Sequence, residues 1–290
     1  MAVAACLMLA ACEAPAVLDA DAMEQVQDEA QKTKKFTFTM KGDFSDEWKP
    51  VTRGYLAADG KDLTDVWVLD YMGDNLVQQL HQSDNTAADF GKPVMQLAYG
   101  SHHIYFIATR GTEPTLTTDA ATLTWAKPSD TFWKDYSVDV VSTSNGNRAV
   151  TLDRVVTKLK LAFTDEVPEG CTQLAVTPAT WYYGLNYRTG QPCAPQTATE
   201  RTVAVPASYV GTSDQLMMTI YGLSTAAEWQ TALTIEARAD GGGVLGSATI
   251  PDAPFKANRV TEYSGPIFGT TGPLALSLSA EWESSYEGTW

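Results

Sequence analysis

Apolar and polar residues alternate along most of the chain. In the segment FTFTM at residues 36–40, the apolar side chains share one face and the threonines share the other. A period of two is typical of a β-strand with one buried face. Alternation or short apolar runs predict further strands at residues 66–71, 76–81, 94–99, 104–109, 121–125, 136–142, 154–164, 173–177, 201–205, 215–221, 231–239, 244–250 and 274–282.

Turn sequences separate these strands at short intervals. Residues 73–75 (GDN) predict a hairpin in the first half, and residues 241–243 (GGG) predict another in the second. Strands do not alternate with helical segments, which favours antiparallel sandwiches over a parallel sheet. The break at residues 145–147 (NGN) predicts a boundary between two domains, at 36–147 and 148–290.

Length and charge exclude several classes of protein. The chain has 290 residues, a formal net charge of −15, 44% hydrophobic residues and 19% charged residues. This hydrophobicity excludes a disordered acidic chain. The negative charge argues against nucleic acid as a partner, because no basic surface is available to neutralise phosphates.

The first residues predict export. The apolar run in MAVAACLMLAAC is too short to span a bilayer and is typical of a signal peptide. LAAC at residues 9–12 matches a bacterial lipobox, which predicts a signal peptide at 1–11 and a lipid on Cys12. A plain signal peptide with an incidental cysteine is the alternative. Residues 12–35 then form the lipidated N-terminus and a polar tether, or alternatively a helix.

Besides the lipidated Cys12, the mature chain has two cysteines, Cys171 and Cys193. In an exported protein such a pair suggests a disulfide, although two free thiols are the alternative. Cys-x-x-Cys does not occur, which leaves a zinc or thioredoxin-like site without support.

The sequence carries no enzyme signature. It lacks His-Glu-x-x-His, Gly-x-Ser-x-Gly, a Walker loop and EF-hand spacing, so no cofactor, catalytic residue or metal site is predicted. His102 and His103 are adjacent on one strand and should point to opposite faces, unable to share a metal. Trp67 and Trp125 lie at strand positions, where core packing competes with a sugar-stacking platform.

Arg53 and Gly54 follow the first strand in polar surroundings. An exposed Arg-Gly bond between two elements is a good protease substrate, and an ordinary loop arginine is the alternative.

Four stretches in this order resemble the fimbrillin and fimbrial-anchor superfamily of Bacteroidetes, especially FimB-like lipoprotein subunits. They are LAAC with its tether, LTDVWVLD at residues 63–70, LDRVVTKLKL at 152–161 and NRVTEYSGPIF at 258–268. The resemblance implies two transthyretin-like antiparallel β-sandwich domains in tandem and no catalysis. It also implies a lipid anchor in the outer membrane and assembly with other fimbrial subunits by β-strand donation.

In polymerising subunits of that family, an Arg-specific protease removes the first strand, and Arg53 occupies the matching position. Anchor subunits keep their first strand and lipid, so both roles stay open. The segment at residues 274–282 is the expected donor strand. A surface glycan-binding lipoprotein with an aromatic platform is the alternative function, and a secreted hydrolase is a third class.

Overall fold

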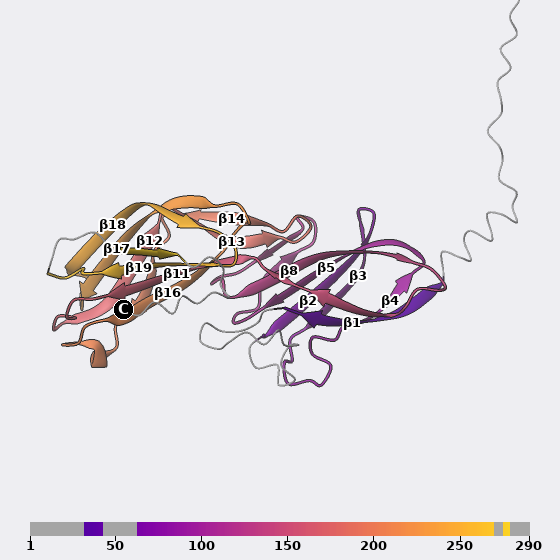
Figure 1. Ribbon diagram of the computed structural model, residues 1–290, viewed down its shortest axis with the longest axis horizontal. Coiled ribbons are helices and arrows are strands. Elements are labelled where there is room, and N and C mark those ends of the chain that lie inside the picture. The colour runs from indigo at the N-terminus through magenta and orange to yellow at the C-terminus, as the bar shows by residue number, and fades with distance from the viewer. Residues whose placement is uncertain (1–31, 43–62, 270–274, 279–290) are drawn as a thin grey trace, which may run out of the picture.

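A computed structural model describes residues 32–42, 63–269 and 275–278 of the chain. These residues form an all-β protein in which two sandwiches lie end to end along the long axis (Figure 1). The expected fold class is therefore confirmed. Within the described ranges, no helix has the length and hydrophobicity needed to cross a membrane.

The strands of the first half are β1 (Thr33–Lys41), β2 (Asp65–Met72), β3 (Asn75–Gln82), β4 (Val94–Ala98), β5 (Gly100–Thr109), β6 (Thr115–Thr117), β7 (Thr122–Thr124), β8 (Thr131–Val140), β9 (Asn147–Thr151) and β10 (Asp153–Arg154). Those of the second half are β11 (Val156–Phe163), β12 (Cys171–Pro178), β13 (Thr180–Asn186), β14 (Gln191–Thr197), β15 (Arg201–Ala204), β16 (Gln215–Leu223), β17 (Trp229–Ala239), β18 (Val244–Phe255), β19 (Arg259–Gly265) and β20 (Ala275–Leu278). A single 3₁₀ turn, η1, spans Ala207–Tyr209.

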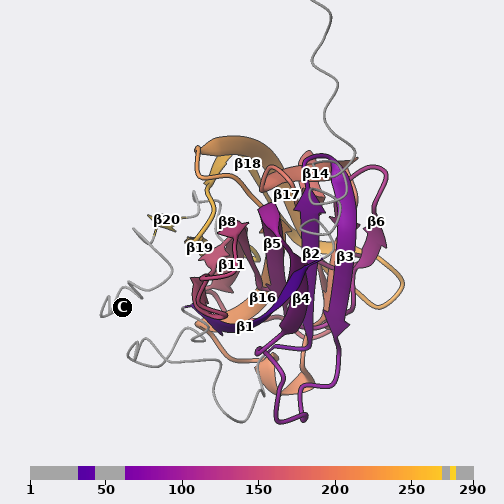
Figure 2. The same ribbon diagram turned by 90° about the vertical axis from the view of Figure 1, so that its right-hand side faces the viewer.

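The first sandwich packs the sheet β4-β1-β9 against the sheet β10-β8-β5-β2-β3. Figure 2 views it end-on, with β1 and β4 on one side and β2, β3 and β5 on the other. The predicted hairpin is formed by β2 and β3, which turn at Gly73 with a φ of 61°. Alternate residues of β2 face two different cores: Val66 and Val68 face the sandwich interior, whereas Trp67 and Leu69 face the other half of the molecule.

The second sandwich repeats the topology of the first. Its sheets are β16-β11-β19-β20 and β15-β12-β17-β18. β11 lies between antiparallel β16 and parallel β19, just as β1 lies between antiparallel β4 and parallel β9. β12 likewise lies between its partners β15 and β17, as β2 lies between β3 and β5. The C-terminal strand β20 is an addition that lies beside β19.

A shared sheet joins the two halves. β6 and β7 from the first half continue the sheet of β13 and β14 from the second, with Leu185 opposite Leu123. A buried cluster packs beneath it and draws residues from both halves, including Trp67, Tyr105 and Tyr187. The halves are thus linked by hydrogen bonds and by a common apolar core.

The strand pairing places the boundary between the sandwiches after residue 154, and not after residue 147. Residues 147–151 form β9, which pairs with β1, and Asp153 and Arg154 pair with β8. Residues 148–154 therefore belong to the first sandwich, not the second. A turn at residues 141–144 leads the chain from β8 to β9 beside β1, so the break at 145–147 is not a linker between the sandwiches. β1 likewise begins at Thr33, so the last residues assigned to the tether lie in a strand.

Candidate functional site

The position of β1 makes it the candidate functional element. It is the central strand of its sheet, and Phe36, Phe38 and Met40 are almost fully buried between the two sheets. The ring of Phe38 packs edge-on against Phe106, with ring centroids 5.0 Å apart, and against Tyr136. The alternation seen in the sequence therefore directs these apolar side chains into the core.

Backbone hydrogen bonds hold β1 along its whole length. Beyond the sheet pairing itself, Tyr99 N–H donates to Lys32 C=O at one end of β1 (2.9 Å), and Leu152 N–H donates to Lys41 C=O at the other (2.7 Å). Gly146 lies so close to β1 that a Cβ atom there would overlap the carbonyl oxygen of Lys35. Gly146 is thus the residue that allows β9 to approach β1.

Most of the predicted site residues lie outside the described residues. These are the lipidation site Cys12, with the signal peptide before it, and the protease site Arg53-Gly54, which follows β1 in the sequence. The expected donor segment at 274–282 is described only at residues 275–278, where β20 pairs with β19.

The two later cysteines are not joined. Cys171 is buried and Cys193 is half-buried, and both are free thiols. Cys171 lies on β12 in the second sandwich, whereas Cys193 lies on β14 in the shared sheet. The disulfide considered from the sequence is therefore not formed, and burial raises the pKa of both thiols above the ordinary cysteine value.

None of the tryptophans that the structure describes is exposed, and Trp133 and Trp229 are half-buried. Trp67, Trp125 and Trp181 are buried, which confirms core packing for the first two. The described residues therefore supply no exposed tryptophan platform of the kind that a glycan-binding function would use.

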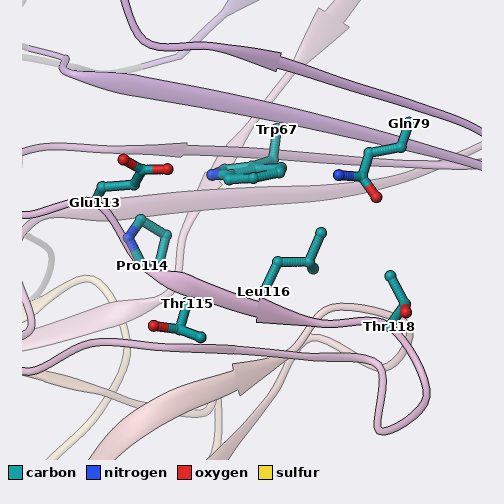
Figure 3. Close-up of a pocket in the computed structure, with 7 residues that line it drawn as sticks. All are labelled: Trp67, Gln79, Glu113, Pro114, Thr115, Leu116 and Thr118. Atoms are coloured by element: carbon teal, nitrogen blue, oxygen red, sulfur yellow. The ribbon is translucent and has the colours of Figure 1, made fainter.

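An open pocket of about 610 Å³ lies beside Trp67 (Figure 3). Its lining comes from β2, β3 and the segment around β6: Trp67, Gln79, Glu113, Pro114, Thr115, Leu116 and Thr118. Next to it, Asp65, His81 and Glu113 each offer one potential metal-binding atom, and these atoms lie within 4.8 Å of one another. The sequence predicted no metal site because no local spacing marks this group.

The sequence pattern also did not predict two buried pairs of charged side chains. His102 is buried and bonded to Asp70, whereas His103 on the same strand is exposed, so the two rings do point to opposite faces. Arg154 makes a two-pronged ion pair with Asp130, with its Nε 2.8 Å from Oδ1 and its Nη2 3.2 Å from Oδ2. A third nitrogen of Arg154 donates to Asn258 in the second sandwich, so this group bridges the two halves.

Comparison with known proteins gives structural neighbours alone. No family model and no curated protein matches the sequence. A candidate adhesin from Bacteroides thetaiotaomicron superposes with a TM-score of 0.54 at 9% identity, covering 85% of this chain and 97% of that one. A candidate polysaccharide-binding protein from the same species gives a TM-score of 0.50 at 9% identity, covering 85% and 96%.

The fold is that of these Bacteroides proteins. The fimbrial anchor protein Mfa2 from Porphyromonas gingivalis also aligns, at 9% identity and a TM-score of 0.46, covering 80% of this chain and 91% of that one. That superposition is too loose to bear on function. The two-sandwich fold that the resemblance implies is thus shared with the two Bacteroides proteins.

Proposed function

We propose that this chain is a non-enzymatic subunit of an adhesive fimbria on the cell surface, and that it assembles by strand exchange at the β1 position. The place of β1 carries the proposal, because it is a central strand that local cleavage of the chain would detach. The chain shares its fold with a candidate adhesin, which also supports a role in adhesion.

Loss of β1 would leave a deep groove in the first sandwich. β4 and β9 would lose their common partner and expose two rows of unpaired backbone groups. The buried side chains of Met95, Leu97 and Val150 would line the groove. Such an edge recruits a strand, since backbone hydrogen bonds supply affinity and the side-chain pockets supply specificity.

The C-terminal segment of another subunit is the proposed donor. In LALSLSAEW at residues 274–282, leucines recur at every second position. This spacing matches that of Phe36, Phe38 and Met40, whose pockets the donor would fill.

Whether the chain is a stalk subunit or an anchor depends on cleavage after Arg53 and on the lipid at Cys12. Cleavage after Arg53 would release β1 together with the lipid on Cys12, as suits a stalk subunit. An intact N-terminus would keep the protein in the outer membrane, as suits an anchor. Loss of metabolic palmitate labelling in Cys12→Ala tests the lipid, and equal labelling of the variant would exclude it.

Limited digestion of the folded protein with an Arg-specific protease tests strand exchange. We expect a new N-terminus at Gly54, followed by slow growth of SDS-resistant oligomers. Arg53→Gln is the matched control and should neither be cut there nor polymerise. Truncation at residue 273 should permit cleavage but prevent polymerisation, because the donor strand is gone.

Two results would overturn parts of the proposal. Efficient cleavage at Arg53 with the product remaining monomeric would contradict strand exchange by cleavage. Resistance at Arg53, with the lipidated N-terminus intact in native filaments, would exclude the stalk role and leave the anchor.

A further inference from the structure

The ring of His81 is held in one orientation beside the pocket in Figure 3. It stacks flat on the indole of Trp67, with ring centroids 3.7 Å apart and an interplanar angle of 7°. Its Nε2 atom lies 2.9 Å from Oδ1 of Asp65, a side chain that is only 4% exposed. Trp67 and Asp65 both lie on β2, which pairs with β3, the strand of His81. The two contacts therefore fix the imidazole before any ligand binds.

The contact with Asp65 also sets the chemistry of the other ring nitrogen. A carboxylate only accepts hydrogen bonds, so Nε2 carries the proton in that contact. In the neutral ring, Nδ1 then has a free lone pair. A carboxylate that orients a histidine in this way is the usual support behind a metal ligand, and it makes the imidazole a better donor.

A second donor atom faces Nδ1. Oε1 of Glu113 lies 3.7 Å from it, too far for a hydrogen bond. Typical Zn–N and Zn–O distances are each about 2 Å, so one ion can reach both atoms. The two carboxylates and the neutral ring together carry two negative charges, which matches a divalent cation.

We propose that His81 Nδ1 and Glu113 Oε1 bind a divalent transition-metal ion such as Zn²⁺, with Asp65 positioning the imidazole. A mixed nitrogen and oxygen donor set favours such ions over Ca²⁺ and Mg²⁺, which prefer oxygen alone. The remaining coordination positions open to the pocket, where water or an oxygen-bearing ligand completes them.

Trp67 supplies an independent indication that something polar belongs here. Its side chain is buried, with 7% exposure, yet among the described residues its Nε1–H has no hydrogen-bond partner. In Figure 3 the nitrogen end of the indole points to the side of the pocket where Glu113 lies. An oxygen atom bound to the metal would give this N–H the acceptor that it lacks.

Calorimetric titration with ZnCl₂ tests the proposal on the full chain, with affinity tags removed and thiols blocked by alkylation. We expect one ion per chain. Glu113→Gln removes an exposed ligand without disturbing the core and should weaken binding at least tenfold, and Asp65→Asn should weaken it about 10- to 100-fold by freeing the ring. His81→Gln should abolish binding.

His103→Gln is the matched control. His103 Nδ1 lies 3.5 Å from Oδ1 of Asp135 on the surface, a similar pair without stacking or a buried carboxylate behind it. Its loss should leave the affinity unchanged. The proposal is overturned if Zn²⁺ does not bind, or if Glu113→Gln binds as tightly as the unmodified chain. It is equally overturned if His103→Gln removes the binding. None of these results depends on strand exchange.

Discussion

The imidazole of His102 on β5 binds the carboxylate of Asp70 within its own sheet and contacts the other sheet of the first sandwich through the carbonyl oxygen of Ala98. Nδ1 lies 2.8 Å from Oδ1 of Asp70 on β2, and Nε2 lies 2.9 Å from the carbonyl oxygen of Ala98 on β4. Both partners are acceptors, so both ring nitrogens donate and the ring is an imidazolium. His102 and Asp70 are each 1% exposed, which makes this a buried ion pair.

Stability should therefore depend on the protonation of His102. Burial alone lowers its pKa, but the hydrogen bonds to Asp70 and Ala98 outweigh this effect and raise the pKa above the ordinary value of 6.5. The folded protein then holds a proton that the unfolded chain releases. The contribution is complete below the unfolded pKa and is lost as the pH rises through the folded pKa.

Urea unfolding of the unmodified protein and of His102→Gln, measured from acidic to alkaline pH, checks this expectation. The stability difference between them should shrink as the pH rises. His103→Gln is an exposed control on the same strand and should stay within about 0.5 kcal/mol of the unmodified protein. A difference that is constant with pH would contradict a charged His102.

The Arg154–Asp130 pair should hold the two sandwiches together. Both side chains are 2% exposed, so removal of Arg154 leaves the buried carboxylate of Asp130 with only the longer contact to Arg110, at 3.7 Å. We expect Arg154→Ala to lower the free energy of unfolding by about 3–5 kcal/mol. Arg154 also donates a hydrogen bond to Asn258 in the second sandwich. Part of the lost stability therefore comes from the junction between the halves.

An exposed ion pair on neighbouring strands provides the comparison. Lys134 Nζ lies 2.9 Å from Asp153 Oδ2, with side chains 38% and 64% exposed. Lys134→Ala should cost about 1 kcal/mol or less, because solvent screens this pair. Chemical denaturation of both variants measures the contrast. Equal losses would contradict a special role for Arg154.

Alternating apolar residues predicted the strands that bury one face. Strands that lie at a sheet edge or carry an ion pair on a mixed face were not predicted. β1 and the β2–β3 hairpin follow from alternation and turn residues. β14 contains Pro192 and Pro195, which argue against a strand, but it lies at a sheet edge where proline is tolerated. β19 has a mixed polar face, because Glu262 there pairs with Lys160 across the sheet.

The site residues that were missed depend on contacts between distant segments. Asp70 shares its strand face with Val66 and Val68, so alternation alone could have flagged a buried acid. Its partner His102 is far away in the sequence, and no spacing rule joins them. His81 and Glu113 come together only because β3 and the segment before β6 meet at the pocket.

The free thiols of Cys171 and Cys193 can be tested directly. Burial raises both pKa values, so little reactive thiolate forms near neutral pH and alkylation of the folded protein should be slow. Cys193 is less buried and should react first. Unfolding without reductant should make both fully reactive. Mass spectrometry of unreduced peptides provides the measurement, and a cross-linked peptide pair would contradict the free state.

Phe38 should control how tightly β1 is held. The side chain is fully buried against Phe106 and Tyr136, so Phe38→Ala should cost about 3–5 kcal/mol through the lost contacts and the cavity. Thr39→Ala, on the opposite face of the same strand, should cost about 1 kcal/mol or less. In hydrogen exchange, Phe38→Ala should accelerate the amides of β1 far more than those of β5, because β1 can open while the rest of the sandwich persists. Equal acceleration in both strands would mean that β1 leaves only by global unfolding, and would argue against its exchange for another strand.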